Sequence, residues 1–247
     1  MSGRLEGRTA LITGASRGIG KAIARRLAAE GARIGIHYGS SEADARALAA
    51  EIEAGGGSAF LVRARLDDLD GVAALAEGIP AGERIDILVN NAGISPPSGT
   101  DADEATFDAL VAVNMKAPFF LIQRLAPRIA DGGRIINLSS GLSHLPFPDA
   151  IVYSMTKAAL NAMTRSFAKA LGPRGICVNA VLPGIIRTDM SAWVDGPGGA
   201  ERASARSVFR RVGEAADVAD IVAFLASDDS RWGTGELIDA SGGQFLV

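Results

Sequence analysis

The chain has 247 residues, of which 48% are hydrophobic and 21% charged, and its net charge is −3. This length can bury a large core and fits a single α/β domain over residues 1–247, because no repeat and no linker-like stretch divides it. The acidic balance offers no basic surface for nucleic acid or for an anionic membrane, so we expect neither partner.

Short apolar runs alternate with longer helical patterns along the chain. The apolar runs predict strands at 9–13, 33–38, 59–62, 85–89, 134–138, 177–182 and 236–239. Helical patterns lie near 18–30, 41–54, 69–78, 103–130, 152–171 and 214–226. Because the strands are apolar throughout, they indicate a doubly wound, Rossmann-type parallel sheet of about seven strands with helices on both faces. Pro118 and Pro127 predict a kink or an early end in the fourth helical pattern.

The N-terminus and the scarcity of metal-binding residues narrow the compartment and the chemistry. The first residues lack the apolar core of a secretion signal, and no uninterrupted apolar run approaches the roughly 20 residues that span a bilayer. We therefore expect a soluble, cytoplasmic protein. The single cysteine, Cys177, lies in an apolar run and the chain has only two histidines, so no metal site is expected.

A glycine-rich turn, Thr13-Gly-Ala-Ser-Arg-Gly-Ile-Gly20, lies between the first strand and the first helix. Glycines allow the backbone to approach a pyrophosphate, and the helix N-terminus adds free N–H groups and the positive end of its dipole. In this position the turn predicts a dinucleotide phosphate site. The alternative is a tight connection without a ligand.

Tyr153 and Lys157 stand four residues apart, and Ser140 precedes Tyr153 by thirteen. On a helix this spacing places both side chains on one face, where the ammonium lowers the cost of ionising the phenol. The pattern favours acid–base chemistry beside a nucleotide, although tyrosine–lysine pairs also occur as ordinary surface contacts.

With Asn90-Asn91-Ala92-Gly93, Asn114, Pro183-Gly184 and Gly242-Gly243, these motifs stand in an order that resembles the short-chain dehydrogenase/reductase family nearly end to end. The resemblance implies Tyr153 as acid/base, Ser140 as partner of the substrate oxygen and Lys157 as ribose binder and pKa modulator. It implies Asn114 as the water-holding link of a proton relay. The implied cofactor contacts are Gly14, Ser16, Arg17, Gly18, Ile19, Gly20, Ser40, Leu66, Asn91, Ala92, Gly93, Tyr153, Lys157, Pro183, Gly184, Ile186 and Thr188. Read without the resemblance, Ser140 is ordinary turn chemistry and Asn114 a satisfied polar group inside a helix.

The end of the second strand bears on the choice of cofactor. NAD sites usually place a carboxylate there, whereas this strand ends His37-Tyr38-Gly39-Ser40. Arg17 lies in the glycine turn, where the resemblance implies a guanidinium that faces a phosphate, so NADP(H) is expected in preference to NAD(H). The alternative is that Arg17 is solvated and Glu42 accepts the ribose. Arg65 stands where many family members carry Asp or Asn against adenine, and it is either a surface residue or an addition to the phosphate side.

The substrate should lie in the loops after the fifth and sixth strands, which are rich in apolar residues. The candidate pocket residues are Leu142, His144, Phe147, Met190 and Trp193. They predict an apolar or aromatic ketone, or a 3-oxoacyl group carried on a protein that Arg174 helps to dock, although Asp131 opposes such docking. The segment near 187–211, with Gly196-Pro197-Gly198-Gly199 at its centre, is expected to be a mobile lid. The alternative is a surface insertion in a subunit contact.

The helix that carries Tyr153 has apolar residues over an arc of about 220°, far wider than one buried stripe of roughly 100°. A second face of this helix should therefore contact another subunit. The resemblance implies a homo-tetramer, and a dimer is the alternative. The expected activity is NADP(H)-dependent reduction of a ketone or oxidation of the matching secondary alcohol. The alternatives are an NAD(H)-dependent alcohol, sugar or steroid dehydrogenase and a non-catalytic NADP-binding regulator.

Overall fold

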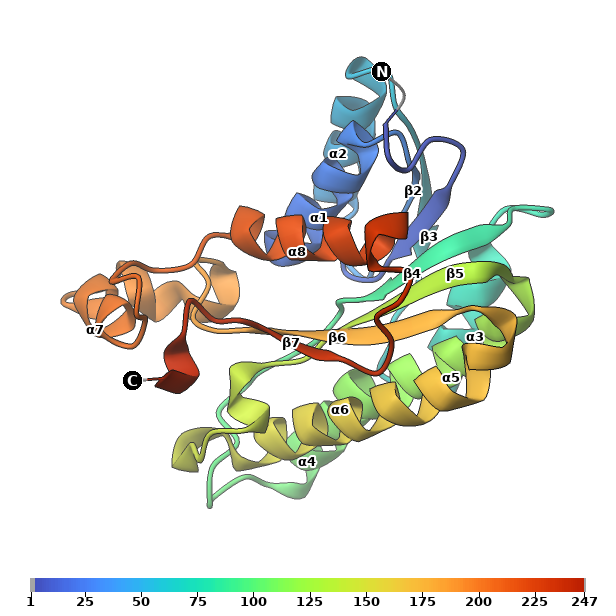
Figure 1. Cartoon of the computed structure of the whole chain (residues 1–247). Helices are drawn as coiled ribbons and strands as arrows, with labels where there is room; N and C mark the ends of the chain where they lie inside the picture. Colours follow the sequence, from blue (N-terminus) through green and yellow to red (C-terminus); the bar gives the residue numbers. More distant parts are fainter. Residues whose placement is uncertain (1–2, 247) are drawn as a thin grey trace.

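The computed structural model describes residues 3–246 and contains one seven-stranded parallel sheet in the order β3-β2-β1-β4-β5-β6-β7 (Figure 1). The strands are β1 (Thr9–Ile12), β2 (Arg33–Tyr38), β3 (Ser58–Arg63), β4 (Ile85–Asn90), β5 (Ile129–Leu138), β6 (Cys177–Pro183) and β7 (Leu237–Ala240). Chain order reverses between β1 and β4, which is where a doubly wound sheet opens a crevice at the carboxyl ends of its strands. The predicted fold class is confirmed.

Helices cover both faces of the sheet. They are α1 (Gly18–Ala29), α2 (Glu42–Ala54), α3 (Leu69–Gly78), α4 (Glu104–Val111), α5 (Ala117–Leu125), α6 (Ile151–Leu171), α7 (Gly199–Ala205) and α8 (Ala215–Ala226). Figure 1 shows α1, α2 and α8 on one face, and α3, α4, α5 and α6 on the other. Each face has its own apolar core, one centred on Ile12, Leu27 and Val222 and the other on Leu11, Leu88 and Ile122. Alternate residues of each strand enter opposite cores, which explains the continuously apolar strands.

The helical pattern expected over 103–130 is interrupted at one point. Asp103 caps α4 by accepting the Thr106 N–H at 2.8 Å, and a π-helical turn at Ala112–Lys116 then joins α4 to α5. Pro118 follows this turn, and because proline has no N–H, the carbonyl of Asn114 receives no i→i−4 bond from it. Pro127 lies in the short helical turn Ala126–Arg128 that ends the segment. The prolines therefore mark the irregularity and the end, as predicted.

The stretch Glu104–Arg128 is long and apolar enough, by length and composition alone, to cross a membrane. In this fold one of its faces packs Leu121, Ile122 and Leu125 into the core beneath β4 and β5. The stretch is thus a layer of the domain, interrupted by the π-helical turn.

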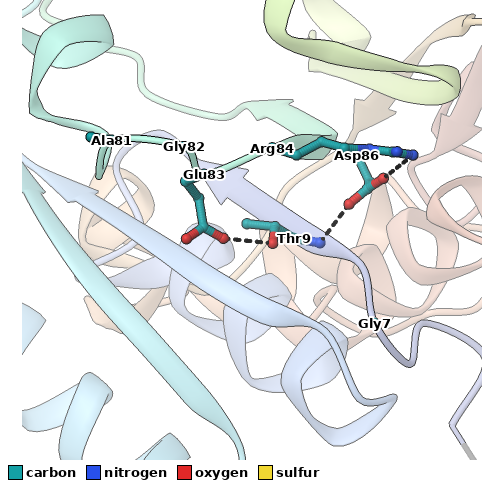
Figure 2. Close-up of a pocket in the computed structure, with 7 residues that line it drawn as sticks. All are labelled: Gly7, Thr9, Ala81, Gly82, Glu83, Arg84 and Asp86. Carbon is teal, nitrogen blue, oxygen red and sulfur yellow. Dashed lines mark hydrogen bonds and ion pairs between the residues drawn. The ribbon is translucent and has the colours of Figure 1, made fainter.

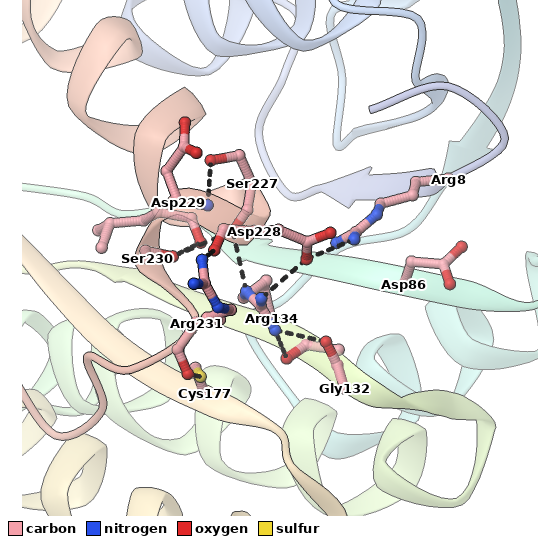
Figure 3. A network of polar contacts seen from close by, with 12 residues as sticks. Arg8, Asp86, Gly132, Arg134, Cys177, Ser227, Asp228, Asp229, Ser230 and Arg231 are labelled. Carbon is pink, nitrogen blue, oxygen red and sulfur yellow. Dashed lines mark hydrogen bonds and ion pairs between the residues drawn. The ribbon is translucent and has the colours of Figure 1, made fainter. Parts of the chain in front are cut away.

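Strand β5 begins at Ile129, five residues before the expected 134–138, because pairing with β4 continues across an irregularity in register. Arg134 holds this strand in place and is buried (Figure 3). Its guanidinium donates to the Gly132, Gly133 and Ser227 carbonyls and to Asp228, which also accepts from Arg8 at 2.6 Å. This network joins β5 to the turn after α8 and therefore stabilises the fold.

The segment expected to be a mobile lid is folded into helical turns. It contains a 3-10 segment, Asp189–Asp195, and helix α7, which begins at Gly199. A Cβ at Gly199 would collide with the Trp193 carbonyl, so glycine permits the tight approach of the two turns. Val194, Ala203 and Val212 form a small core of their own. Figure 1 shows α7 projecting beyond the sheet near the C-terminal turn.

Candidate active site

The glycine-rich turn leaves β1 at the crevice and leads directly into α1. Gly14 and Gly18 have φ values of 63° and 54°, a region that favours glycine, and a Cβ on Gly20 would collide with the Gly14 carbonyl. Arg17 takes the extended N-cap position of α1, so the free N–H groups of the first helical turn face the crevice. The predicted phosphate-binding turn is thus formed at the expected place in the fold.

The segment after β4 braces this turn. The side-chain amide of Asn91 donates to the carbonyls of Thr13 and Gly14, at 2.8 and 3.1 Å. In return, the Thr13 hydroxyl accepts the N–H groups of Asn91 and Ala92, at 3.0 and 2.9 Å. Four hydrogen bonds therefore join the two segments after β1 and β4 and hold the turn in place.

At four of the expected cofactor-contact positions only the backbone is available to a ligand. The side chains of Ile19, Leu66, Ala92 and Ile186 pack into or against the apolar cores. At these positions only the peptide groups are available to a ligand. The buried side chain of Ser16 and the exposed side chains of Arg17 and Ser40 remain free to contribute through their own polar groups.

Tyr153 and Lys157 lie on α6, and Ser140 follows the end of β5, so the sheet and the helix bring the three residues together. All three are buried, with 8%, 5% and 8% of their surfaces exposed. The Lys157 Nζ donates to the Leu138 carbonyl at 2.8 Å and lies 5.6 Å from the centre of the Tyr153 ring. Ser140 Oγ accepts the Leu142 N–H at 3.2 Å. The predicted spacing thus corresponds to a real cluster.

Burial governs the titration of this cluster. It raises the pKa of the Tyr153 phenol, and the hydrogen bond with Ser140 acts in the opposite direction. Burial also lowers the pKa of Lys157 to about 8. Both shifts favour neutral groups, because a low-dielectric site disfavours charge. Tyr153 therefore keeps its proton at neutral pH, and a nearby positive charge would favour its ionisation.

Asn114 lies in the π-helical turn and is 1% exposed. Its side chain makes two reciprocal bonds to Ile94, donating to the carbonyl and accepting the N–H, both at 2.9 Å. A third, weaker bond at 3.3 Å reaches the Thr156 hydroxyl. The Asn114 side chain is therefore engaged within the fold, and Pro118 has no N–H to donate to the Asn114 carbonyl.

Gly93 separates Asn114 from Lys157. A Cβ built on it would lie 3.3 Å from Asn114 Oδ1 and 3.6 Å from Lys157 Nζ. A side chain at this position would fill the space between the two polar groups, so glycine keeps it open. This space and the glycine-rich turn are both compatible with a bound dinucleotide.

The segment after β6 lies above the glycine turn. Gly184 packs against Ser241 and Gln244 without room for a Cβ, and Thr188 places its methyl group 3.5 Å from the position of a Cβ on Gly18. Thr188 also caps the next helical turn with Ser191. Arg17 faces the exposed Asp189 carboxylate at 3.6 Å. The predicted contacts Pro183, Gly184 and Thr188 are therefore grouped around the same crevice.

Two charged residues near the adenine side are already paired. Glu42 makes an i,i+4 ion pair with Arg46 at 2.7 Å on an exposed helix face. Arg65 makes two hydrogen bonds to Asp67, at 2.8 and 2.6 Å, and its side chain is 81% exposed. These partners reduce the availability of Glu42 for a ribose and of Arg65 for a phosphate.

The candidate substrate residues lie in three places. Leu142 and Phe147 pack in the small cluster that contains Tyr153. Met190 and Trp193 are half exposed on the segment after β6, and the Trp193 ring lies 6.0 Å from the Arg202 guanidinium. His144 is exposed and contacts an aromatic ring from the end of the chain.

Two residues near the catalytic loop escaped the sequence analysis. Phe245 packs edge-on against His144, with ring centres 5.9 Å apart, and lies against Gly141. Arg206, at the end of α7, places its guanidinium 5.8 Å from the Phe147 ring. Both contacts join segments distant in sequence. In the sequence, only the position of Phe245 shortly after Gly242-Gly243 could have pointed to it.

A separate hollow of about 520 Å³ lies near the start of β1 and β4, and Figure 2 shows its lining. Its carboxylates already have partners, because Glu83 accepts from the Thr9 hydroxyl at 2.8 Å and Asp86 accepts the Thr9 N–H at 2.9 Å. The hollow therefore lacks free groups for chemistry. Across residues 3–246, no group of three His, Cys, Asp or Glu side chains is placed to hold a metal ion.

Comparison with known proteins agrees with this geometry. A family model described as Enoyl-(Acyl carrier protein) reductase matches residues 14–244. A 3-oxoacyl-[acyl-carrier-protein] reductase of Staphylococcus aureus is 38% identical, over 97% of this chain and 98% of its own length.

Two solved structures are also similar. The promiscuous reductase LugOII, which catalyses keto-reduction at C1 in lugdunomycin biosynthesis, is 49% identical with a TM-score of 0.94, over 98% of this chain and 100% of its own. The angucycline C-6 ketoreductase LanV with bound NADP is 46% identical with a TM-score of 0.95, over 100% and 99%. By its motifs, its fold and these relatives, the chain is an oxidoreductase that belongs to the short-chain dehydrogenase/reductase family.

Proposed function

We propose that this protein is an NADP(H)-dependent ketoreductase that reduces an apolar or aromatic ketone to the secondary alcohol. The observation that carries the proposal is the buried cluster of Ser140, Tyr153 and Lys157, beside the space that Gly93 leaves open. Carbonyl reduction needs a positioned proton donor, and burial keeps the Tyr153 phenol protonated by raising its pKa.

In the proposed reaction the reduced nicotinamide supplies the hydride when it is bound. Tyr153 Oη donates its proton to the substrate oxygen, and Ser140 Oγ hydrogen-bonds that oxygen and orients it. Lys157 binds the ribose hydroxyls and offsets the charge left on the phenol. The Asn114 carbonyl holds a water that returns a proton to the cluster. In alcohol oxidation the same groups act in reverse.

The preference for NADP(H) rests on two features. The end of β2 carries no carboxylate, and the Arg17 guanidinium is exposed beside the glycine-rich turn. The LanV structure with bound NADP supports the same choice. An exposed ion pair such as Arg17–Asp189 contributes little stability, so a 2′-phosphate would displace Asp189 readily.

A small ketone is favoured over a substrate on a carrier protein. Arg174, the residue considered for carrier docking, donates to Asp131 at 2.8 Å and to the Ala126 and Ile129 carbonyls. It therefore connects the start of β5 to the end of α6 and has few donors left for a carrier. The apolar side chains of Leu142 and Phe147 beside Tyr153, with Phe245 near the same loop, suit an apolar or aromatic ketone, and LanV, an angucycline ketoreductase, is similar to this chain.

We also propose that the chain assembles as a homo-tetramer, with a dimer as the alternative. Two large apolar side chains lie exposed on neighbouring helices, Met155 on α6 and Phe119 on α5, and the Phe119 ring is 5.5 Å from that of Phe167. Such exposed apolar side chains are suited to contact with a second copy of the chain. Light scattering coupled to size-exclusion chromatography measures the mass directly, and a monomer would contradict the proposal.

A spectrophotometric screen tests the activity. NADPH oxidation is followed with polycyclic aromatic ketones, simple cyclic ketones, quinones, sugars and β-ketoacyl thioesters, both free and carrier-bound. We expect the highest kcat/KM with an aromatic ketone. Tight NADPH binding without turnover on any substrate would favour a non-catalytic regulator, and equal use of NADH with a sugar would favour the sugar dehydrogenase alternative.

A further inference from the structure

His37 is a buried imidazole that the proposed reaction does not use. It is the penultimate residue of β2, beneath the glycine-rich turn, and only 2% of its surface is exposed. Histidine is seldom buried so completely without a specific partner. The two ring nitrogens of His37 should therefore have identifiable hydrogen-bond partners.

Both nitrogens contact the backbone of a loop beside the cofactor crevice. Nδ1 accepts the Gly14 N–H at 3.0 Å, and Nε2 lies 3.2 Å from the Ala64 carbonyl. Because the Gly14 N–H can only donate and a carbonyl can only accept, the partners assign the proton to Nε2. The His37 carbonyl also accepts the Ala15 N–H, at 2.9 Å.

The ring stays neutral under physiological conditions. Burial lowers the pKa of His37 to about 4. The lone pair on Nδ1 is consequently available to Gly14 near pH 7. A proton on Nδ1 would instead face the Gly14 N–H and break this contact.

His37 and Asn91 hold Gly14 from opposite sides. Asn91 binds the Gly14 carbonyl, His37 binds its N–H, and the residue between these contacts has a φ of 63°. Both hydrogen-bonding groups of this left-handed residue are thereby fixed. The direction of the following peptides, which lead to the N-terminus of α1, depends on that conformation.

We propose that His37 is a positioning residue of the cofactor site, which sets the conformation of the phosphate-binding turn through Gly14 and ties it to the loop after β3 through Ala64. The inference rests on the proposed use of NADP(H). The inference predicts that His37 acts on cofactor binding and leaves the chemical step unaffected. The His37 ring bonds to Gly14 and Ala64 and not to Tyr153 or Ser140.

Three variants separate the two contacts. In His37→Asn, the side-chain oxygen lies near the position of Nδ1 and retains the Gly14 bond. In His37→Gln, the longer amide reaches toward Ala64 and gives up the Gly14 bond. His37→Leu keeps comparable bulk without either bond. The readouts are KM for NADPH, its Kd from fluorescence titration, KM for the ketone, and kcat at saturating NADPH.

We expect the Asn variant to bind NADPH within about threefold of the wild type, and the Leu variant to lose about tenfold or more, the loss typical of a buried N–H left unpaired. In both variants kcat and the ketone KM should change by less than about threefold. If the Leu variant does not fold, the Asn–Gln pair decides, since the proposal requires tighter NADPH binding by Asn.

Equal NADPH affinity in the folded Asn and Leu variants would refute the role of His37, as would a loss confined to kcat. Tighter binding by Gln than by Asn would also refute the Gly14 contact as the determinant. These outcomes presuppose a wild-type chain that binds NADPH. Failure of the wild type to bind NADPH would refute the proposed cofactor instead, so the two failures are distinguishable.

Discussion

The ammonium of Lys157 lies 5.6 Å from the centre of the Tyr153 ring and donates its hydrogen bond to the Leu138 carbonyl. The lysine is therefore anchored to the sheet rather than to the phenol. Burial is the main influence on the pKa of the Tyr153 phenol and raises it. The arrangement keeps Tyr153 protonated and places the Lys157 ammonium near its ring.

Replacement of this phenol tests the proton donor. Tyr153→Phe should lower kcat by roughly 10²–10⁴-fold, the usual contribution of positioned acid–base catalysis. NADPH affinity should remain close to that of the wild type, because the ring and its packing are retained. Steady-state kinetics with a fluorescence titration of NADPH measures both values, and near-normal turnover of the pure variant would remove Tyr153 from this role.

The pH profile should follow Lys157. Burial lowers its pKa to about 8, so the ammonium is lost as pH rises through that value. The cation that supports the ionised phenol then disappears, and kcat for ketone reduction should be highest below about pH 8 and fall above it. Lys157→Arg keeps its charge and should shift the fall upward. A wild-type profile that is flat to about pH 10 would contradict the assignment.

Cofactor selectivity should depend on Arg17 and its ion-pair partner. The wild type should prefer NADPH over NADH by about tenfold or more, given one or two charge-assisted hydrogen bonds. Arg17→Ala should narrow this ratio mainly by weakening NADPH binding. Asp189→Asn removes the competing carboxylate and should tighten NADPH binding two- to threefold, by roughly the value of an exposed ion pair. Equal kcat/KM for both cofactors in the wild type would overturn the preference.

Trp193 tests whether the segment from 187 to 211 closes over substrate. If the segment acts as a lid, Trp193→Ala should raise KM or lower kcat for bulky ketones by several-fold, with NADPH affinity unchanged. Trp193 fluorescence should also respond to the ketone in the NADP complex. Arg202→Ala removes the cation beside the ring and is the matched control for local packing. Unchanged ketone kinetics in an intact assembly would exclude Trp193 from the pocket.

His37 should leave a signature in the pH dependence of stability. Its pKa falls from 6.5 to about 4 on folding, so the unfolded chain binds the proton more readily between these values. The free energy of unfolding should therefore decrease as pH falls from about 6.5 to about 4, by up to roughly 3 kcal/mol. The His37→Asn variant lacks this titrating group. The contributions of the other titrating groups cancel when the variant is compared with the wild type. Urea unfolding measures this free energy for both proteins across the pH range. The free energy of unfolding of the wild type should decrease relative to that of His37→Asn as pH falls. A constant difference between the two proteins would contradict the buried, neutral imidazole.

Much of the architecture followed from local patterns in the sequence. Continuous apolar runs such as 177–182 separated by helical periods predict a parallel sheet covered on both faces, because only buried strands avoid polar residues on either side. The spacing of Tyr153 and Lys157 predicted a shared helix face, since the helical period is a property of the backbone. Tyr153 and Lys157 lie close to Ser140 because strand β5 ends beside α6.

Tertiary contacts decided the remaining features. Pairing with β4 extended β5 back to Ile129, and the Asn114 side chain is bound to the backbone of Ile94. The contact of Phe245 with His144 and the bond of His37 to Gly14 join residues separated by many positions. Periodicity and spacing describe neighbours along one element, whereas these contacts depend on which loops the completed sheet brings to the same edge.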